Sequence, residues 1–346
     1  MEKEIESRKN LPLTDVEKLS ADLPNTYRQE ILRGEIFLAR YGMDRNLKKY
    51  AGLPLDTKIH VLFEHGIQLS DYVEEAFRIH EYLPSMTASQ YRLDILKKQK
   101  DYKGAYAIGP YIHYADSILS KEEINAEKER LGRTLLVFPS HSIDCSTVNF
   151  DLESFMNKIK ETSKDFDSVR ICMYYQDVIL KRHLKYQKEG FEVVTAGHFN
   201  DYYFLSRLKS IIEISDMTMA NDIGTHLGYA IYLNKPHYLF KQPLEFEYRE
   251  IIDKKNTTSI LSNIEYNKNI SDITNLFSEN TPKITKKQYE LISYLWGFDE
   301  VKTPEELRNI IIKINENYSS IKYYLSCFKR TKDLMLEKVS LKLKEL

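Results

Sequence analysis

Short polar loops that combine histidine, glycine and hydroxyl residues follow several apolar segments of this chain. Glu64-His65-Gly66 follows the apolar run Ile59–Phe63. A neutral imidazole near pH 7 can take a proton from an attacking hydroxyl, and a neighbouring carboxylate can orient the ring or act as the base itself. Gly66 lets a substrate approach the backbone closely. We therefore predict proton transfer at His65 or Glu64, and a buried polar pair at a strand end is the structural alternative.

The stretch Ser215–Phe240 predicts a strand, a turn, a helix that opens at Gly224-Thr225, and a second strand. The free N–H groups of a helix N-terminus attract anions, of which phosphate is the usual one, and the Thr225 hydroxyl lies beside them. An ordinary strand–turn–helix unit without a ligand is the alternative. The residues predicted to bind donor phosphates here are Asn221, Gly224, Thr225 and His226.

Two further loops carry imidazole and hydroxyl groups after predicted strands. Ser140, His141 and Ser142 are suitable donors to phosphate oxygens, although a turn with local serine capping would have the same composition. His198, close to Asn200, is a candidate for binding the base or the ribose of a nucleotide. We expect these loops and the His65 loop to converge on one cleft.

The chain has 346 residues, a length that predicts two domains rather than one. Its formal net charge of -1 provides no global basic field of the kind that attracts nucleic acid. Cys145, Cys172 and Cys327 lie far apart and lack metal-binding spacing, which predicts a cytosolic protein in which Cys172 is a core residue. No run reaches the ~18 apolar residues that span a bilayer, and the charged first ten residues predict no signal peptide.

The first 120 residues show the pattern of a doubly wound parallel sheet, whose ligands bind beyond the carboxyl ends of the strands. We expect a helix over 27–50, a helix capped by Ser70 or Asp71, and mobile first residues. The first domain is predicted at 1–120. Its strand candidates are the segments 59–63, 84–88 and 105–108.

The pattern restarts after a charged helix at about 120–132 and contains five strand–helix steps in a row. A second Rossmann-like domain is predicted at 121–300, with a polar irregular stretch at 255–282, and a helical segment at 301–346. The strand candidates are Thr134–Phe138, Val169–Tyr174, Phe191–Thr195, Met217–Ala220 and His237–Phe240. The helices are expected at about 151–162, 177–188, 202–213, 285–295 and 303–315.

The last residues, 321–346, are amphipathic and carry several lysines. This composition suits peripheral contact with an anionic membrane surface. The alternative is a helix that packs on the first domain or on a second subunit of a homo-oligomer.

Several motifs are absent from the sequence. Without GxxxxGK[ST] a phosphate-loop kinase is disfavoured, and without GxGxxG after a strand so is a nicotinamide enzyme. No GxSxG elbow is found. No Asp-x-Asp pair follows a strand to hold a divalent metal under a diphosphate. We therefore expect metal-independent phosphate binding by helix ends and hydroxyls.

The order of these parts resembles the bacterial glycosyltransferases with two Rossmann-like domains, the GT-B fold, which assemble capsule, O-antigen and teichoic acid. Phe63–Gly66 resembles the His-Gly loop of the polymer transferases, in which the loop histidine is the suspected base. Ile108–Tyr111 occupies the place of their Gly-x-Pro-Arg stretch, but the arginine is absent here. Phe138–Ser142 resembles the strand end that opens their donor domain, and Ser215–Pro236 resembles their phosphate-binding segment.

This resemblance implies a metal-independent glycosyltransferase of surface-polysaccharide synthesis, including capsule and lipopolysaccharide. It would move a sugar from a nucleotide-sugar donor, with no other cofactor, to a saccharide or lipid-linked saccharide acceptor. His65 or Glu64 would be the base, and the donor would lie on the second domain. The expected location is the cytoplasm, with peripheral contact at the inner face of the membrane.

Three alternatives stay open at this point. A CMP-linked acidic-sugar transferase, of the sialic acid or Kdo kind, would also use an acidic residue before glycine, but its His-Pro pair is missing. A sugar-nucleotide epimerase would need several carboxylates in the cleft, for which Glu64, Asp144 and Asp201 are few. A non-catalytic nucleotide-binding subunit of a polysaccharide assembly complex is the third.

Overall fold

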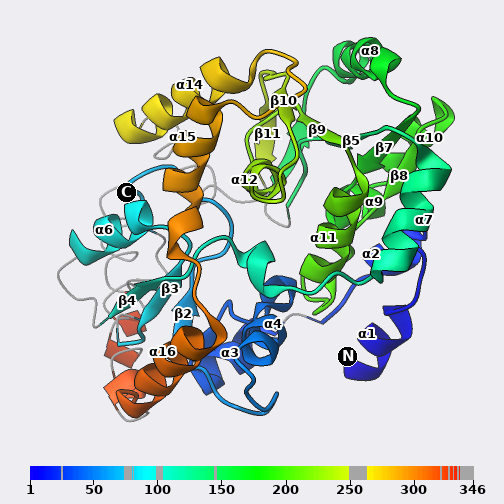
Figure 1. Ribbon diagram of the computed structural model, residues 1–346. Helices are drawn as coiled ribbons and strands as arrows, with labels where there is room; N and C mark the ends of the chain where they lie inside the picture. Colours follow the sequence, from blue (N-terminus) through cyan, green and yellow to red (C-terminus); the bar gives the residue numbers. More distant parts are fainter. Residues whose placement is uncertain are drawn as a thin grey trace, which may run out of the picture.

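The computed structural model describes most of the chain. The residues it describes are 1–24, 26–73, 80, 82–98, 104–143, 146–248, 263–319, 322–325, 328–329, 331–332 and 335. The predicted helix after Ser70, together with Asp144, Cys145, Cys327 and much of the 321–346 segment, lies outside these residues. The predicted fold class is confirmed, because two parallel sheets flanked by helices stand side by side (Figure 1).

The first sheet has four parallel strands in chain order, β1-β2-β3-β4. The expectation of one helix over 27–50 was wrong. Gly34 adopts a left-handed conformation, with φ of 66°, that ends the helix α3 (Tyr27–Arg33) and redirects the chain toward β1. The strands are β1 (Glu35–Ile36), β2 (Val61–Phe63), β3 (Ser85–Thr87) and β4 (Ala105–Ala107). The helices of this half are α3 (Tyr27–Arg33), η1 (Arg40–Gly42), α4 (Met43–Tyr50), α6 (Gln90–Lys98) and η2 (Tyr111–Tyr114).

The second sheet has five parallel strands in the order β10-β9-β5-β7-β8. The chain leaves β5 toward β7 on one side and returns to β9 on the other, so that the order reverses between β5 and β9. In open α/β sheets ligands bind at such a switch point, beyond the carboxyl ends of the two strands. The strands are β5 (Thr134–Phe138), β7 (Ser168–Cys172), β8 (Glu192–Val194), β9 (Met217–Ala220) and β10 (His237–Leu239).

The second sheet is covered by helices on both faces, and β5 shows why. Leu135 and Val137 belong to one apolar cluster, whereas Leu136 and Phe138 belong to another that extends into the first half of the chain. The alternation follows from the period of two in a strand. The helices of this half are α7 (Lys121–Leu131), α8 (Leu152–Thr162), η3 (Ser163–Asp165), α9 (Tyr175–Ile179), α10 (His183–Lys188), α11 (Phe204–Ile214) and α12 (Thr225–Tyr232).

A two-stranded antiparallel ribbon, absent from the sequence-based prediction, joins distant parts of the second half. β6 (Ser146–Asn149) pairs with β11 (Glu245–Tyr248), about 100 residues later in the chain. Pairing over such a separation leaves no local turn signal to detect.

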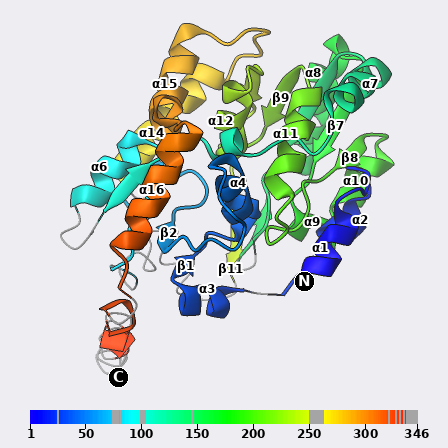
Figure 2. The ribbon, with the colours of Figure 1, turned by 60° about the horizontal axis from the view of Figure 1, so that its bottom comes forward.

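Three longer helices follow the second sheet. The expectation that 255–282 is irregular fails for α14 (Ile264–Phe277), whose N-cap Asn263 accepts from Tyr266 N–H and whose Ile273 is fully buried. α15 (Lys286–Trp296) lies between α6 and α12, and α16 (Pro304–Glu316) packs on α4 (Figures 1 and 2). A short 3-10 turn, η4 (Phe298–Glu300), connects them.

The first residues are also ordered, contrary to the expectation of a mobile end. α1 (Glu2–Arg8) and α2 (Val16–Ser20) lie against the second half, with α2 beside α9 (Figure 2). Ile5 and Leu19 are fully buried there. None of the helices in the described part of the chain combines the length and apolarity that a bilayer crossing needs.

Candidate functional site

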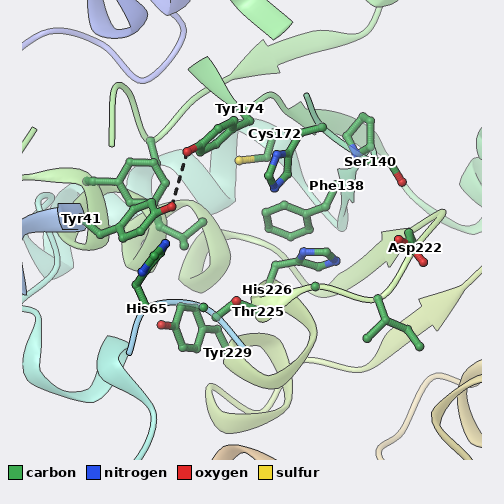
Figure 3. A pocket seen from close by; sticks show the side chains of 18 of the residues that line it. Tyr41, His65, Phe138, Ser140, Cys172, Tyr174, Asp222, Thr225, His226 and Tyr229 are labelled. Carbon is green, nitrogen blue, oxygen red and sulfur yellow. Dashed lines mark hydrogen bonds between the residues drawn. The ribbon is translucent and has the colours of Figure 1, made fainter. Parts of the chain in front are cut away.

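A cavity of about 330 Å³ lies between the two sheets, at the carboxyl ends of their strands (Figure 3). Its volume falls within the range of small-molecule sites. Three loops meet in it: His65-Gly66 after β2, the turn 139–141 after β5, and the turn 222–226 that leads from β9 into α12. The last two loops flank the switch point of the second sheet.

His65 lines the cavity and is held by Arg40, whose Nη1 lies 3.0 Å from His65 Nε2. Arginine only donates hydrogen bonds, so Nε2 is the acceptor, and the neutral ring carries its proton on Nδ1. Burial and the positive charge of Arg40 lower the pKa of His65 to about 3. The ring is therefore neutral at pH 7.

Glu64 does not line the cavity. Its carboxylate is buried and receives hydrogen bonds from Arg92 Nη2 at 2.6 Å and Thr87 Oγ1 at 2.6 Å. The sequence predicted either a base or a buried polar pair, and the structure places Glu64 in the second arrangement. It holds the end of β2 against the helix that carries Arg92.

The N-terminus of α12 faces the His65 loop across the cavity. Thr225 Oγ1 accepts a hydrogen bond from Ile67 N–H at 3.1 Å, which links the two halves of the chain. Gly224 is the N-cap, and a Cβ there would lie 2.8 Å from the His226 ring, which would have to shift to make room for it. Gly66, with φ of 76°, lies close to the Thr225 hydroxyl.

Ser140 lines the cavity, and Asn221 supports it from behind. Asn221 is fully buried, and its Oδ1 accepts from Ser140 N–H at 2.7 Å and from Ser140 Oγ at 2.9 Å. Its Nδ2 donates to Gln242 Oε1 at 3.1 Å. Asn221 thus positions the loop after β5 and is not part of the lining.

Of the neighbours His141 and Ser142, likewise, one lines the cavity and the other lies behind it. His141 lines the cavity, with its ring 4.2 Å from the Tyr174 ring. Ser142 is buried outside it, where its Oγ and its N–H both donate to the Asp177 carboxylate at 2.9 Å. Ser142 Oγ also accepts from Val148 N–H at 3.2 Å, so that it supports the ribbon.

His226 lines the cavity and stacks on Phe138, with ring centroids 4.6 Å apart. Burial, with the neighbouring His237, holds the pKa of His226 well below its usual range. Its buried Nε2 meets no hydrogen-bond partner among the residues that the structure describes. The ring is therefore a neutral group in the wall of the cavity.

His198 lies outside the cavity lining. Its Nδ1 accepts from Asn200 N–H at 3.0 Å, and its Nε2 lies 3.4 Å from Asp22 Oδ1. The loop after β8 reaches the cavity only through Ala196.

Sequence reasoning missed an aromatic wall and part of the ribbon. The Tyr41 and Tyr174 hydroxyls lie 3.4 Å apart in the cavity wall (Figure 3). Phe204 also lines the cavity, with its ring centroid 4.9 Å from that of Tyr41. Cys172 belongs to the buried core, as predicted, and it also lines the cavity; burial raises the pKa of its thiol to about 12. Cys172 and Tyr174 lie at the end of the predicted strand Val169–Tyr174, and this position is the sequence signal that could have placed them at the cavity. The ribbon and the segment before it contribute Val148, Leu244 and Phe246.

Charge is sparse in this cavity. Asp222 is the one carboxylate among the described lining residues, and it pairs with Lys241. Within the described ranges, no group of three or more His, Cys, Asp or Glu side chains is arranged to hold a metal ion. The arrangement offers hydroxyls, neutral imidazoles and a helix N-terminus, which are groups that bind phosphate oxygens by hydrogen bonds.

The solved structures that are similar to this chain include those of two proteins. The wall teichoic acid polymerase TagF has 15% identity and a TM-score of 0.38, with 83% of this chain and 70% of that chain covered. A substituted form of TagF gives the same values. S. aureus MnaA, in a co-structure with UDP, has 12% identity and a TM-score of 0.39, with 88% of this chain and 83% of that chain covered. No protein-family model and no curated protein sequence matches the chain.

Proposed function

We propose that this protein is a metal-independent glycosyltransferase that moves a sugar from a nucleotide-activated donor to a saccharide or lipid-linked acceptor of surface-polysaccharide synthesis. One observation carries the proposal. A single cavity contains an imidazole from the first half and a helix N-terminus from the second, and the loops that hold them are joined by the Ile67–Thr225 hydrogen bond. A base and a phosphate site in one cavity are what glycosyl transfer from a nucleotide donor requires.

In the proposed reaction the acceptor hydroxyl attacks the anomeric carbon of the donor sugar. A new carbon–oxygen bond forms while the bond from that carbon to the phosphate oxygen breaks, and the nucleotide leaves with the electron pair. The proton of the hydroxyl passes to His65 Nε2, the ring nitrogen that carries the lone pair, and Arg40 gives up its hydrogen bond to that nitrogen as the proton arrives. The N–H groups of the first turn of α12, with the Thr225 hydroxyl, stabilise the charge that develops on the leaving phosphate.

The carboxylates argue against the epimerase alternative. Glu64 is paired with Arg92 and Asp201 with Arg207, both pairs being buried, and Asp144 lies outside the described residues. The nucleotide that binds distinguishes our proposal from the acidic-sugar transferase. The effect of removing His65 distinguishes it from the non-catalytic subunit.

The first experiment is a thermal-shift panel without added metal, with UDP, GDP, CDP, CMP, ADP and dTDP. A ligand at about 100 times its dissociation constant should stabilise the fold by about 2.7 kcal/mol. Stabilisation by one nucleoside diphosphate supports the proposal and identifies the donor class. Stabilisation by CMP alone indicates the acidic-sugar transferase, and no stabilisation by any of them contradicts the nucleotide site.

The second experiment compares His65→Ala with a matched histidine variant from the other end of β2. His60 precedes that strand and stacks on Tyr318, 3.6 Å between centroids, outside the cavity lining. We expect His65→Ala to lower kcat by about 10²–10⁴-fold with nucleotide stabilisation unchanged, and His60→Gln to keep kcat. Full activity in His65→Ala would remove His65 as the base. Loss of nucleotide binding in Thr225→Val, with Thr225→Ser near wild type, would place the phosphates at α12.

A further inference from the structure

Arg40 stands directly behind the candidate base. It belongs to η1 and is half-buried, and its Nη1 contacts His65 Nε2 at 3.0 Å. The guanidinium lies over the Phe37 ring at 4.1 Å from its centroid, and 5.6 Å from that of Phe199. Rings against the flat face of a guanidinium leave its N–H edges directed elsewhere.

Among the residues that the structure describes, no carboxylate pairs with the charge of Arg40. The buried arginines of this protein are paired: Arg92 with Glu64 at 2.6 Å, and Arg207 with Asp201 at 2.9 Å. Arg40 forms no such ion pair within the described ranges, and the one hydrogen bond that its side chain makes there goes to His65. A guanidinium has five N–H donors, and Arg40, which is half-buried beside the cavity-lining His65, uses one of them in its hydrogen bond to that ring.

The backbone that presents Arg40 is strained and firmly anchored. Phe37 and Tyr41 have φ of 61° and 58°, in the left-handed region that side chains other than glycine rarely adopt. Glu30 Oε2 accepts from Phe37 N–H at 2.9 Å, and Tyr41 N–H donates to Phe199 O at 2.6 Å. Such strain costs on the order of 1–3 kcal/mol per residue, persists only where surrounding contacts impose it, and gathers at functional sites.

We propose that Arg40 binds an acidic group of the acceptor, a carboxylate or a phosphate, and so holds the reacting hydroxyl beside His65. The proposal rests on the function proposed above. Guanidinium pairs with either group through two parallel N–H···O bonds, which would fix the orientation of the acceptor as well as its position. The substrate class would then be an acidic saccharide or a phosphate-bearing acceptor rather than a neutral sugar.

Binding of that group would also improve the base. The positive charge of Arg40 disfavours protonation of His65 and contributes to the low pKa of the ring. An anion paired with Arg40 offsets that charge, so that the pKa of His65 rises toward the pH at which the enzyme works. An acidic acceptor would therefore activate the residue that deprotonates it.

The test compares acidic ligands with their neutral counterparts by calorimetry on the full chain. The probes are methyl glucuronide against methyl glucoside, and glycerol 3-phosphate against glycerol. The variants are Arg40→Gln, Arg40→Lys and a matched control, Arg45→Gln, whose guanidinium lies over the Tyr202 ring and 3.6 Å from Glu6. Thermal unfolding confirms that each variant is folded. If Arg40→Gln is not folded, the comparison is made with Arg40→Lys.

Wild type should bind at least one acidic probe about tenfold or more tightly than its neutral counterpart. Arg40→Gln should abolish this preference, Arg40→Lys should weaken it, and Arg45→Gln should keep it. The acid that shows the preference identifies the group as carboxylate or phosphate. The proposal is overturned by equal binding of acidic and neutral probes, by a preference that survives Arg40→Gln, or by one that Thr225→Val removes instead. These measurements detect binding and not sugar transfer. The proposal for Arg40 can therefore be judged even if the protein proves inactive in the proposed reaction.

Discussion

Glu64 is the residue whose role changes most between sequence and structure. Its carboxylate is 4% exposed and pairs with Arg92, which is 2% exposed. Replacing one partner of a buried ion pair leaves the other charge uncompensated, at a cost of about 3–5 kcal/mol. We expect Glu64→Gln to lower the free energy of unfolding by that amount, measured by urea denaturation, while the kcat of the folded fraction stays near wild type.

The matched control for Glu64→Gln is Glu161→Gln, which removes an exposed ion pair with Lys158. It should not change the midpoint of urea unfolding measurably. If Glu64→Gln instead kept full stability and lost transfer, the carboxylate would belong to the catalytic machinery.

Strand-end position predicted which loops reach the cavity, but not which side chain of each loop points into it. His65, His141 and Thr225 line it, whereas Ser142 and His198 from similar loops do not. The difference depends on partners remote in sequence. Asp177, which lies 35 residues after Ser142, takes both of its donors. Such pairings are absent from the local pattern, and the two strained residues beside Arg40 leave no sequence signal either.

At the scale of elements, apolar runs were a good guide and polar segments were not. Two strands of the second sheet, Thr134–Phe138 and Met217–Ala220, have the predicted bounds, because a strand covered on both faces is a continuous apolar run. α14 was missed because few apolar side chains, among them Ile273 and Phe277, bury it inside a polar stretch. The β6–β11 ribbon depends on non-local pairing.

The packing of α12 on α15 yields an element-scale prediction. A Cβ at Gly228 would lie 2.1 Å from the ring of Trp296, which is 1% exposed and donates from Nε1 to Thr225 O at 3.2 Å. Alanine would favour an exposed helix by up to ~1 kcal/mol, but overpacking here costs about 1–3 kcal/mol or more. We expect Gly228→Ala to destabilise the protein in urea denaturation and to weaken nucleotide stabilisation at Thr225.

A double-mutant cycle provides the control for Gly228→Ala. Trp296→Leu removes the clashing ring, so the double variant should be more stable than the sum of the two single effects by at least ~0.5 kcal/mol. Strict additivity would mean that the Gly228 position does not act through Trp296.

At the scale of the whole molecule, buried neutral histidines make stability depend on pH. Burial lowers the pKa of His80 to about 4 and that of His237 to about 3, and each side chain is 1% exposed. Below pH 6.5 the unfolded chain binds protons that the folded chain does not, so stability is lost as the pH falls from about 6.5 toward 4. Between pH 7 and 5.5 the two groups should together cost about 2–3 kcal/mol.

Urea denaturation at pH 7 and at pH 5.5 measures this loss directly. His237→Gln removes one of several titrating groups, since the pKa values of His65 and His226 are also lowered by burial, and the difference between the two pH values should fall by about 1 kcal/mol. A free energy of unfolding that is the same at both pH values would show that these rings are protonated in the folded protein.

Each half of the chain packs against a terminal segment that comes from the other end of the sequence. The first residues lie on the second half, where Leu13 O accepts from Thr195 N–H and Leu19 O from His198 N–H, each at 3.1 Å. α16 returns to the first half, where Asn315 Oδ1 accepts from His60 N–H at 3.2 Å. Neither half therefore has its full set of contacts without the other, and we infer that they unfold together.

Leu19→Ala tests this coupling. Leu19 is fully buried, and its truncation should cost about 2–5 kcal/mol. Trp296, the single tryptophan, lies against α12 and next to the loop after β3, far along the chain from Leu19, so its fluorescence reports on the contact between the halves. If unfolding is cooperative, fluorescence and far-UV circular dichroism will move to lower urea together. A fluorescence transition that stays in place while the dichroism shifts would mean that the halves unfold independently.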